Sequence, residues 1–125
     1  MGYAAQQLGI YTTYVPVITG FTTTPTINNA RYTLVGKMCT VDIRLSATAS
    51  NATTKTITLP FAAYGGAVTR VQGWVFNNGA STTGVLRIDT SAGSAVATLY
   101  RDGTGLAWTA SGTADYAFSI TYEIQ

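Results

Sequence analysis

The sequence contains no histidine and only one cysteine, Cys39. Without histidine, Ser-His-Asp and Cys-His catalysis are excluded, and so are histidine-ligated metal sites. A lone cysteine also excludes an intrachain disulfide and a cysteine zinc site. Cys39 shares its strand face with Val41 and Ile43, so we predict a buried thiol that packs as a small hydrophobe. No metal and no cofactor are expected.

Charge is also scarce, because only 10% of the residues are charged and the net charge is +2. Nucleic-acid binding depends on clustered Lys and Arg, and the seven basic residues are spread singly, so no nucleic-acid partner is expected. The N-terminal MGYAAQQLGI lacks the regions of a signal peptide, and no apolar run approaches a membrane span. We therefore expect synthesis in the cytoplasm and no membrane partner. So little charge also predicts that part of the surface contacts a second copy.

The acidic residues do not form a catalytic pattern. A glycosidase needs two carboxyl groups that meet in space, whereas isolated carboxylates on strands are usually solvated or paired. P-loop, GxGxxG and GxSxG motifs are absent. We therefore predict that the protein is not an enzyme. The acidic residues are Asp42, Asp89, Asp102, Asp115 and Glu123.

The clearest positive signal is a run of alternating residues from Cys39 to Thr48, in which every second side chain is apolar. Successive strand side chains point to opposite faces, so this pattern indicates a strand with one buried face. The run Tyr32 to Val35 precedes it, and Gly36-Lys37 has the length and the glycine of a tight hairpin loop. We predict a β-hairpin at the centre of the fold.

The rest of the chain shows turn signals at roughly ten-residue intervals and no helical periodicity. The sequence predicts an all-β fold, an antiparallel two-sheet β-sandwich of jelly-roll type with about eight strands. A single domain, 11–125, follows an N-terminal arm, 1–10, and 21–29 is expected to be a polar loop. A strand at 68–76 is expected to be covered on both faces. The other expected strands are 11–18, 55–59, 84–90, 95–101, 106–109 and 115–124.

Two sets of residues are candidates for binding. Trp74 and Trp108 suit stacking on sugar rings, although packing in the core or against another subunit is the favoured interpretation. The segments around Asn77, Asn78 and Asp102 suit loops at one end of a sandwich, where recognition residues often lie. Asn and Gly are equally what tight turns require, so a purely structural role stays open.

One further pattern is formed by Ala30–Val41, Arg44, Leu59–Phe61 and Thr121–Ile124. In these residues the chain resembles the small β-rich modules of tailed-bacteriophage virion proteins, which occur in tail fibres, tailspikes, head fibres and capsid decoration proteins. The resemblance implies a jelly-roll-like domain that works as a non-enzymatic homotrimer on the virion surface. The family pattern carries no invariant binding residue to this chain.

Three roles follow as expectations. A capsid decoration protein would bind the major capsid protein or another virion protein, and it is favoured because only about ten residues precede the first expected strand. A receptor-binding module of a tail fibre or tailspike would bind host surface carbohydrate. A free lectin-like domain is the third alternative, and it would lose sugar binding when Trp74 or Trp108 is replaced.

Overall fold

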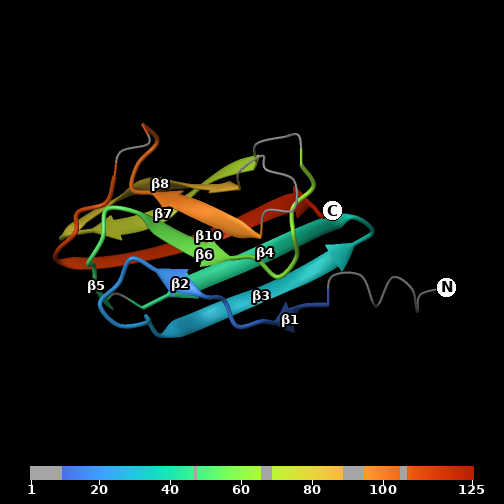
Figure 1. The fold of residues 1–125 in the computed structure, drawn as a ribbon, viewed down its shortest axis with the longest axis horizontal. Coiled ribbons are helices and arrows are strands. Elements are labelled where there is room, and N and C mark those ends of the chain that lie inside the picture. Colours follow the sequence, from blue (N-terminus) through green and yellow to red (C-terminus); the bar gives the residue numbers. More distant parts are fainter. Residues whose placement is uncertain (1–9, 47, 66–68, 89–94, 105–106) are drawn as a thin grey trace.

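The computed structural model describes residues 10–46, 48–65, 69–88, 95–104 and 107–125, and in this part of the chain every regular element is a β-strand. The all-β prediction is therefore confirmed (Figure 1). The strands are β1 (Thr12–Thr13), β2 (Ile18–Thr19), β3 (Ile27–Val35), β4 (Met38–Leu45), β5 (Thr48–Ala49), β6 (Lys55–Thr58), β7 (Thr69–Asn77), β8 (Ala80–Ile88), β9 (Val96–Tyr100) and β10 (Thr113–Glu123).

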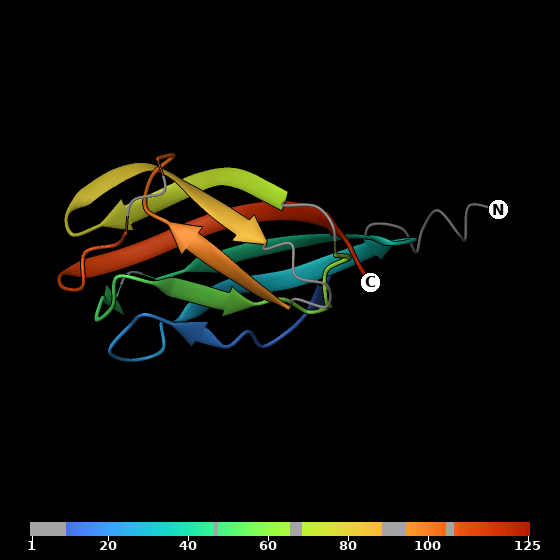
Figure 2. The same cartoon turned by 45° about the horizontal axis from the view of Figure 1, so that its top comes forward.

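These strands form one antiparallel sheet in the order β1-β3-β4-β10-β7-β8-β9-β6-β2, with β5 paired to β10. The two ends of this path, β1 and β2, are separated in sequence only by residues 14–17. Tyr14 N–H donates to Ala30 on one edge (3.0 Å), and Val17 C=O accepts from Thr58 on the other (3.1 Å). The sheet therefore curls until one short segment spans both of its edges (Figure 2).

The curl passes through the β7–β8 hairpin, where two glycines face each other. Gly73 pairs with Gly84 in the β7–β8 register. A Cβ on Gly73 would collide with the Phe118 ring, and a Cβ on Gly84 would lie 2.6 Å from the Tyr100 carbonyl oxygen. Only glycine fits this close approach, because any side chain would push the neighbouring strands apart.

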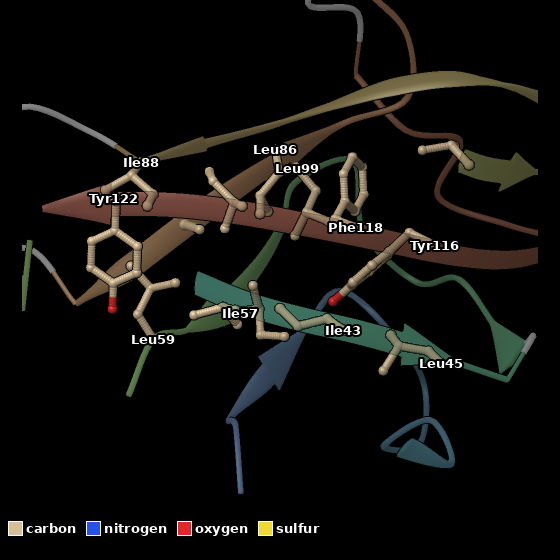
Figure 3. Close-up of a cluster of buried hydrophobic side chains, with 14 of the residues drawn as sticks. Ile43, Leu45, Ile57, Leu59, Leu86, Ile88, Leu99, Tyr116, Phe118 and Tyr122 are labelled. Atoms are coloured by element: carbon tan, nitrogen blue, oxygen red, sulfur yellow. The ribbon is translucent and has the colours of Figure 1, made fainter. Parts of the chain in front are cut away.

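The core lies inside the curl, and β10 supplies several of its large side chains. Tyr116, Phe118, Ile120 and Tyr122 are buried on one face, as the alternation predicts. Figure 3 shows these rings and the side chains of β4 facing aliphatic side chains from β6, β8 and β9. Cys39 is buried, as predicted, and burial raises the pKa of its thiol.

The predicted hairpin at Gly36-Lys37 is confirmed, and β7 and β8 form a second hairpin. Val35 pairs with Met38 across the two-residue loop Gly36-Lys37. In the β7–β8 hairpin, Asn78 and Gly79 both have positive φ, 47° and 92°. This pair of left-handed residues is typical of the type I′ turn that matches the twist of a hairpin.

Several strand boundaries differ from the predictions. The expected strand 11–18 is divided into β1 and β2, because Pro16 between them has no N–H for a ladder. The expected loop 21–29 ends in strand residues, since Ile27 pairs with Leu45 next to a bulge. Strand β8 begins at Ala80 instead of residue 84.

Residues 107–109 form no strand, contrary to the prediction, because their backbone bonds elsewhere. Trp108 N–H donates to the Thr53 carbonyl (3.1 Å), and Thr109 N–H donates to the side-chain oxygen of Asn77 (3.0 Å). Parts of other predictions lie outside the described residues. These parts are nearly all of the arm 1–10, the turn at 91–94 and the strand ends at 68, 89, 90 and 106.

Removal of the hydroxyl group should change the free energy of unfolding in opposite directions at the two buried tyrosines of β10, Tyr116 and Tyr122. Tyr116 Oη is buried and has no hydrogen-bond partner among the residues that the structure describes, so Tyr116→Phe should raise the free energy of unfolding by about 1 kcal/mol. Tyr122 Oη donates to the Phe61 carbonyl (2.8 Å), so Tyr122→Phe should lower it by about 1–2 kcal/mol. Urea unfolding of both variants tests this, and equal effects would contradict it.

Candidate functional site

The outer face of β7 carries a row of exposed polar and aromatic side chains. Arg70, Gln72 and Trp74 alternate outward and are exposed, whereas Val75 is buried on the inner face. The prediction that this strand is covered on both faces is therefore wrong. The strand has one open face because its neighbours β10 and β8 lie beside it and nothing in the described chain packs over it.

Gln72 lines three adjoining hollows on this outer face. The largest, about 510 Å³, is bordered by side chains of β7, β8 and β9 and by the start of the next loop. The second contains Trp74, and the third extends across β10 to Arg44 of β4. We call this region the Gln72 surface and define it by Arg44, Arg70, Gln72, Trp74, Arg87 and Tyr100.

Trp74 presents an open aromatic face on this surface. Its side chain is 42% exposed and stacks on Phe76, with ring centroids 6.4 Å apart and planes at 26°. Its cross-strand neighbours are Thr83 and Ala117, which are too small to cover an indole. An exposed indole that is supported by a second ring in this way can stack on a sugar ring and can also donate a hydrogen bond from its N–H.

Positive charge lies beside Gln72 on the same surface. Arg70 and Arg87 are direct cross-strand partners, and both point outward. Arg87 Nη1 donates to the Tyr100 hydroxyl (3.4 Å). Like charges placed directly opposite each other destabilise a sheet slightly.

Asp115 lies on the outward side of β10, near Arg44, but it is nearly buried. Its Oδ1 accepts a hydrogen bond from Tyr116 N–H (2.7 Å). Burial raises the pKa of this carboxyl, while the Tyr116 hydrogen bond and the charge of Arg44 act in the opposite direction. Asp115 therefore supports the backbone under the surface and offers no free carboxylate to a ligand.

The structure separates the two tryptophans that the sequence placed together as candidates. Trp108 is only 2% exposed, and its Nε1–H donates to the Leu99 carbonyl (3.0 Å). The ring of Trp108 lies in the core beside Tyr116, where a glycan cannot reach it, which corrects its place among the candidate contacts. The favoured packing interpretation holds for Trp108, whereas Trp74 stays a candidate contact.

Asn77 and Asn78 have structural roles at the end of β7. The buried Asn77 amide binds Thr109 through both of its polar atoms, at 3.1 and 3.0 Å. Asn78 occupies the turn, and its N–H donates to the Thr113 carbonyl (2.8 Å). Asn77 is thus unavailable to a ligand, which corrects its place among the candidate contacts.

Asp102 shapes the rim of the largest hollow. Its Oδ1 accepts hydrogen bonds from the N–H and the hydroxyl of Thr104, at 2.9 and 2.6 Å. Thr104 itself lines the hollow, with Gly103 beside it. Asp102 therefore holds the loop next to the Gln72 surface in place, and residue 105 of the predicted loop lies outside the described residues.

Sequence reasoning missed a buried lysine, Lys55. Its Nζ donates to the Gly20 carbonyl and to Ser50 Oγ (2.7 Å), and lies 4.3 Å from the centre of the Phe21 ring. Burial lowers its pKa to about 8. The strand pattern could have revealed it, because Lys55 shares the inward face of β6 with Ile57.

The Ser50–Lys55 pair does not form an accessible nucleophile. The Ser50 hydroxyl donates its proton to the Thr109 carbonyl (2.6 Å), and Lys55 has no exposed surface. A serine activated by a lysine needs a hydroxyl that substrate can reach. The pair instead ties together three chain segments next to the core.

Neither a metal-binding cluster nor a possible membrane helix occurs in the described part of the chain. The described residues place no three Cys, Asp or Glu side chains where they could hold an ion. None of them belongs to a helix long and apolar enough to cross a membrane.

Comparison with family models, curated proteins and solved structures finds no match to this chain. The resemblance to phage virion modules therefore rests on the residue pattern alone and stays a prediction.

Lys55 makes the free energy of unfolding depend on pH. Its pKa is about 8 in the folded protein against an ordinary value of 10.5, so the unfolded state binds more protons in this interval and stability rises with pH. Burial raises the pKa of Cys39 and of three tyrosines, which opposes the rise above about pH 9. From pH 7 to 9 we expect a gain of about 1 kcal/mol.

Lys55→Met should abolish this gain, and Lys37→Met, at an exposed lysine of the β3–β4 turn, should keep it. Denaturant unfolding of the wild type and both variants at pH 7, 8 and 9 provides the measurement. A gain that persists in Lys55→Met would show that another group titrates.

Proposed function

We propose that the protein is a non-enzymatic bacteriophage virion structural protein that forms a homotrimer on the particle surface. In the first place we propose a capsid decoration protein, which binds the major capsid protein or another virion protein. The residue pattern that resembles phage virion modules supports this proposal, and an exposed apolar strip supports the self-association.

The apolar strip consists of Val15, Val17 and Val96. The valines at 15 and 17 are 89% and 64% exposed, with the buried Pro16 between them, and Val96 is 42% exposed. Val17 accepts a hydrogen bond from Thr58, which pairs with Val96, so the strip crosses the β2 edge of the sheet. Clustered exposed valines on a protein with little charge are typical of a contact surface. This strip is the observation that carries the proposed assembly.

We assign the curled sheet to the jelly-roll type as part of the same proposal. The support is the packing of one half of the sheet on the other, in which β4 and β10 face β6 and β9 around a shared core. The hydrogen bonds continue through β7 and β8 between the halves, as in a partly opened barrel.

The purified chain should have the solution mass of three chains, measured by light scattering behind a sizing column. Val15→Thr combined with Val17→Thr should reduce the mass to that of one chain, because the apolar contact becomes polar while the β-branched shape remains. Val35→Thr, at an exposed valine of the β3–β4 hairpin, is the matched control and should remain trimeric. A wild-type monomer at high concentration would refute the homotrimer.

A second candidate function is a receptor-binding module that recognises host surface carbohydrate. The exposed Trp74 on the polar Gln72 surface favours it, because aromatic faces flanked by polar groups are typical of sugar sites.

Cosedimentation separates these two roles. Binding to phage shells that lack this protein is expected for decoration, whereas binding to host cells or their isolated glycans is expected for the receptor-binding module. Because the strip and Trp74 are distinct, Trp74→Ala should leave shell binding unchanged and abolish cell binding. Shell binding that is lost with Trp74→Ala would contradict this division.

A further inference from the structure

We infer that the Gln72 surface binds a carboxylated glycan chain, with a sugar ring on Trp74 and a carboxylate on Arg70. This inference rests on the second candidate function and specifies the class of its ligand. Three observations carry it: the spacing along β7, the placement of positive charge, and the polar groups between them.

The spacing requires a chain of sugars. Arg70 and Trp74 both point outward from β7, four residues apart, which corresponds to roughly 13 Å at a rise of about 3.3 Å per residue. A single sugar ring cannot reach both side chains. Gln72 lies midway between them and lines the hollows on either side, so its amide can donate to and accept from the hydroxyl groups of an intervening sugar.

The charge favours an acidic ligand. Arg70 is exposed, and no described residue forms an ion pair with it. Arg87 lies opposite it, and none of the described side chains that line the largest hollow is a carboxylate. An arginine guanidinium binds a carboxylate through two parallel hydrogen bonds, which gives both attraction and orientation.

The Tyr100 hydroxyl completes the polar lining. It accepts from Arg87 Nη1, which leaves its own proton free to donate to a ligand oxygen. Thr104, held by Asp102, adds a second hydroxyl-bearing residue at the rim. Stacking and charge are thus arranged along β7, and the hydroxyl groups lie to one side of that line, on β9 and the loop that follows it.

Single-stranded nucleic acid is the other polymer that combines stacking with negative charge. The surface fits it less well, because Trp74 is its one exposed aromatic face among the described residues and Phe76 lies behind that face. Nucleic-acid binding along a backbone also needs repeated cations, whereas here they are few. We therefore treat an oligonucleotide as an outcome to be tested.

Hexagalacturonate is the probe, and its fully methyl-esterified form is the matched ligand without charge. Isothermal titration calorimetry on the full chain should detect binding of hexagalacturonate, the acid. Its methyl ester should bind at least about tenfold more weakly, as expected when a charged hydrogen bond is lost. Monogalacturonate should bind too weakly to measure. Added salt should weaken the binding of the acid.

Three variants locate the site. Arg70→Gln should weaken hexagalacturonate binding about tenfold and leave the ester unaffected, whereas Trp74→Ala should weaken both ligands. Lys37→Gln removes one positive charge from the distant β3–β4 turn and should change nothing. Unchanged thermal unfolding of Arg70→Gln would show that its effect is local.

The inference is overturned if acid and ester bind equally, if neither binds, or if an oligothymidylate binds more tightly than hexagalacturonate. Equal binding of acid and ester would still leave the glycan-binding role standing, with a neutral ligand. None of these outcomes changes the mass measurement or the shell-binding test, so failure of this inference is distinguishable from failure of the proposed function.

Discussion

A single sheet has to bury its own inner face, and the rest of the structure depends on this constraint. In the described chain no helix covers the sheet, so the inner face is covered by the sheet itself and by connecting segments such as the one that carries Trp108. Curling brings the side chains of β4 and β10 against those of β6 and β9. Gly73 and Gly84 permit the close approach at the bend, and the segment 14–17 joins the two edges that the curl brings together.

The same constraint separates the functional candidates from the core. Because side chains alternate, each residue that faces the interior places its neighbours on the outer face. Along β7 the inward positions end in Val75 and Asn77, and the outward ones are Arg70, Gln72 and Trp74. Lys55 is a charged residue at an inward position, and the alternation buries it even so. Its ammonium group therefore has to donate to carbonyl and hydroxyl oxygens inside the protein.

Periodicity in the sequence predicted those strands whose two faces differ clearly. The apolar alternation of Cys39 to Leu45 and of Tyr116 to Tyr122 predicted β4 and β10, and Gly36-Lys37 predicted the hairpin between β3 and β4. The close approach of Gly73 and Gly84 was not predictable, because it depends on pairing between distant strands. Nor did residue type distinguish Trp74 from Trp108, although Trp74 shares its strand face with the polar Arg70 and Gln72, whereas Trp108 lies in no periodic segment.

The apolar strip and the Gln72 surface meet on one strand without sharing a residue. Val96 and Tyr100 stand at opposite ends of β9 and both point outward, roughly 13 Å apart at the usual strand rise of about 3.3 Å per residue. Self-association through the strip would therefore leave each Gln72 surface open. A homotrimer formed in this way would carry three Gln72 surfaces. Each weak contact with a repeating polymer would then raise the effective concentration of the polymer at the other two surfaces. A shallow site with few charges can therefore recognise a polymeric ligand when several copies of the site in one assembly bind the same polymer.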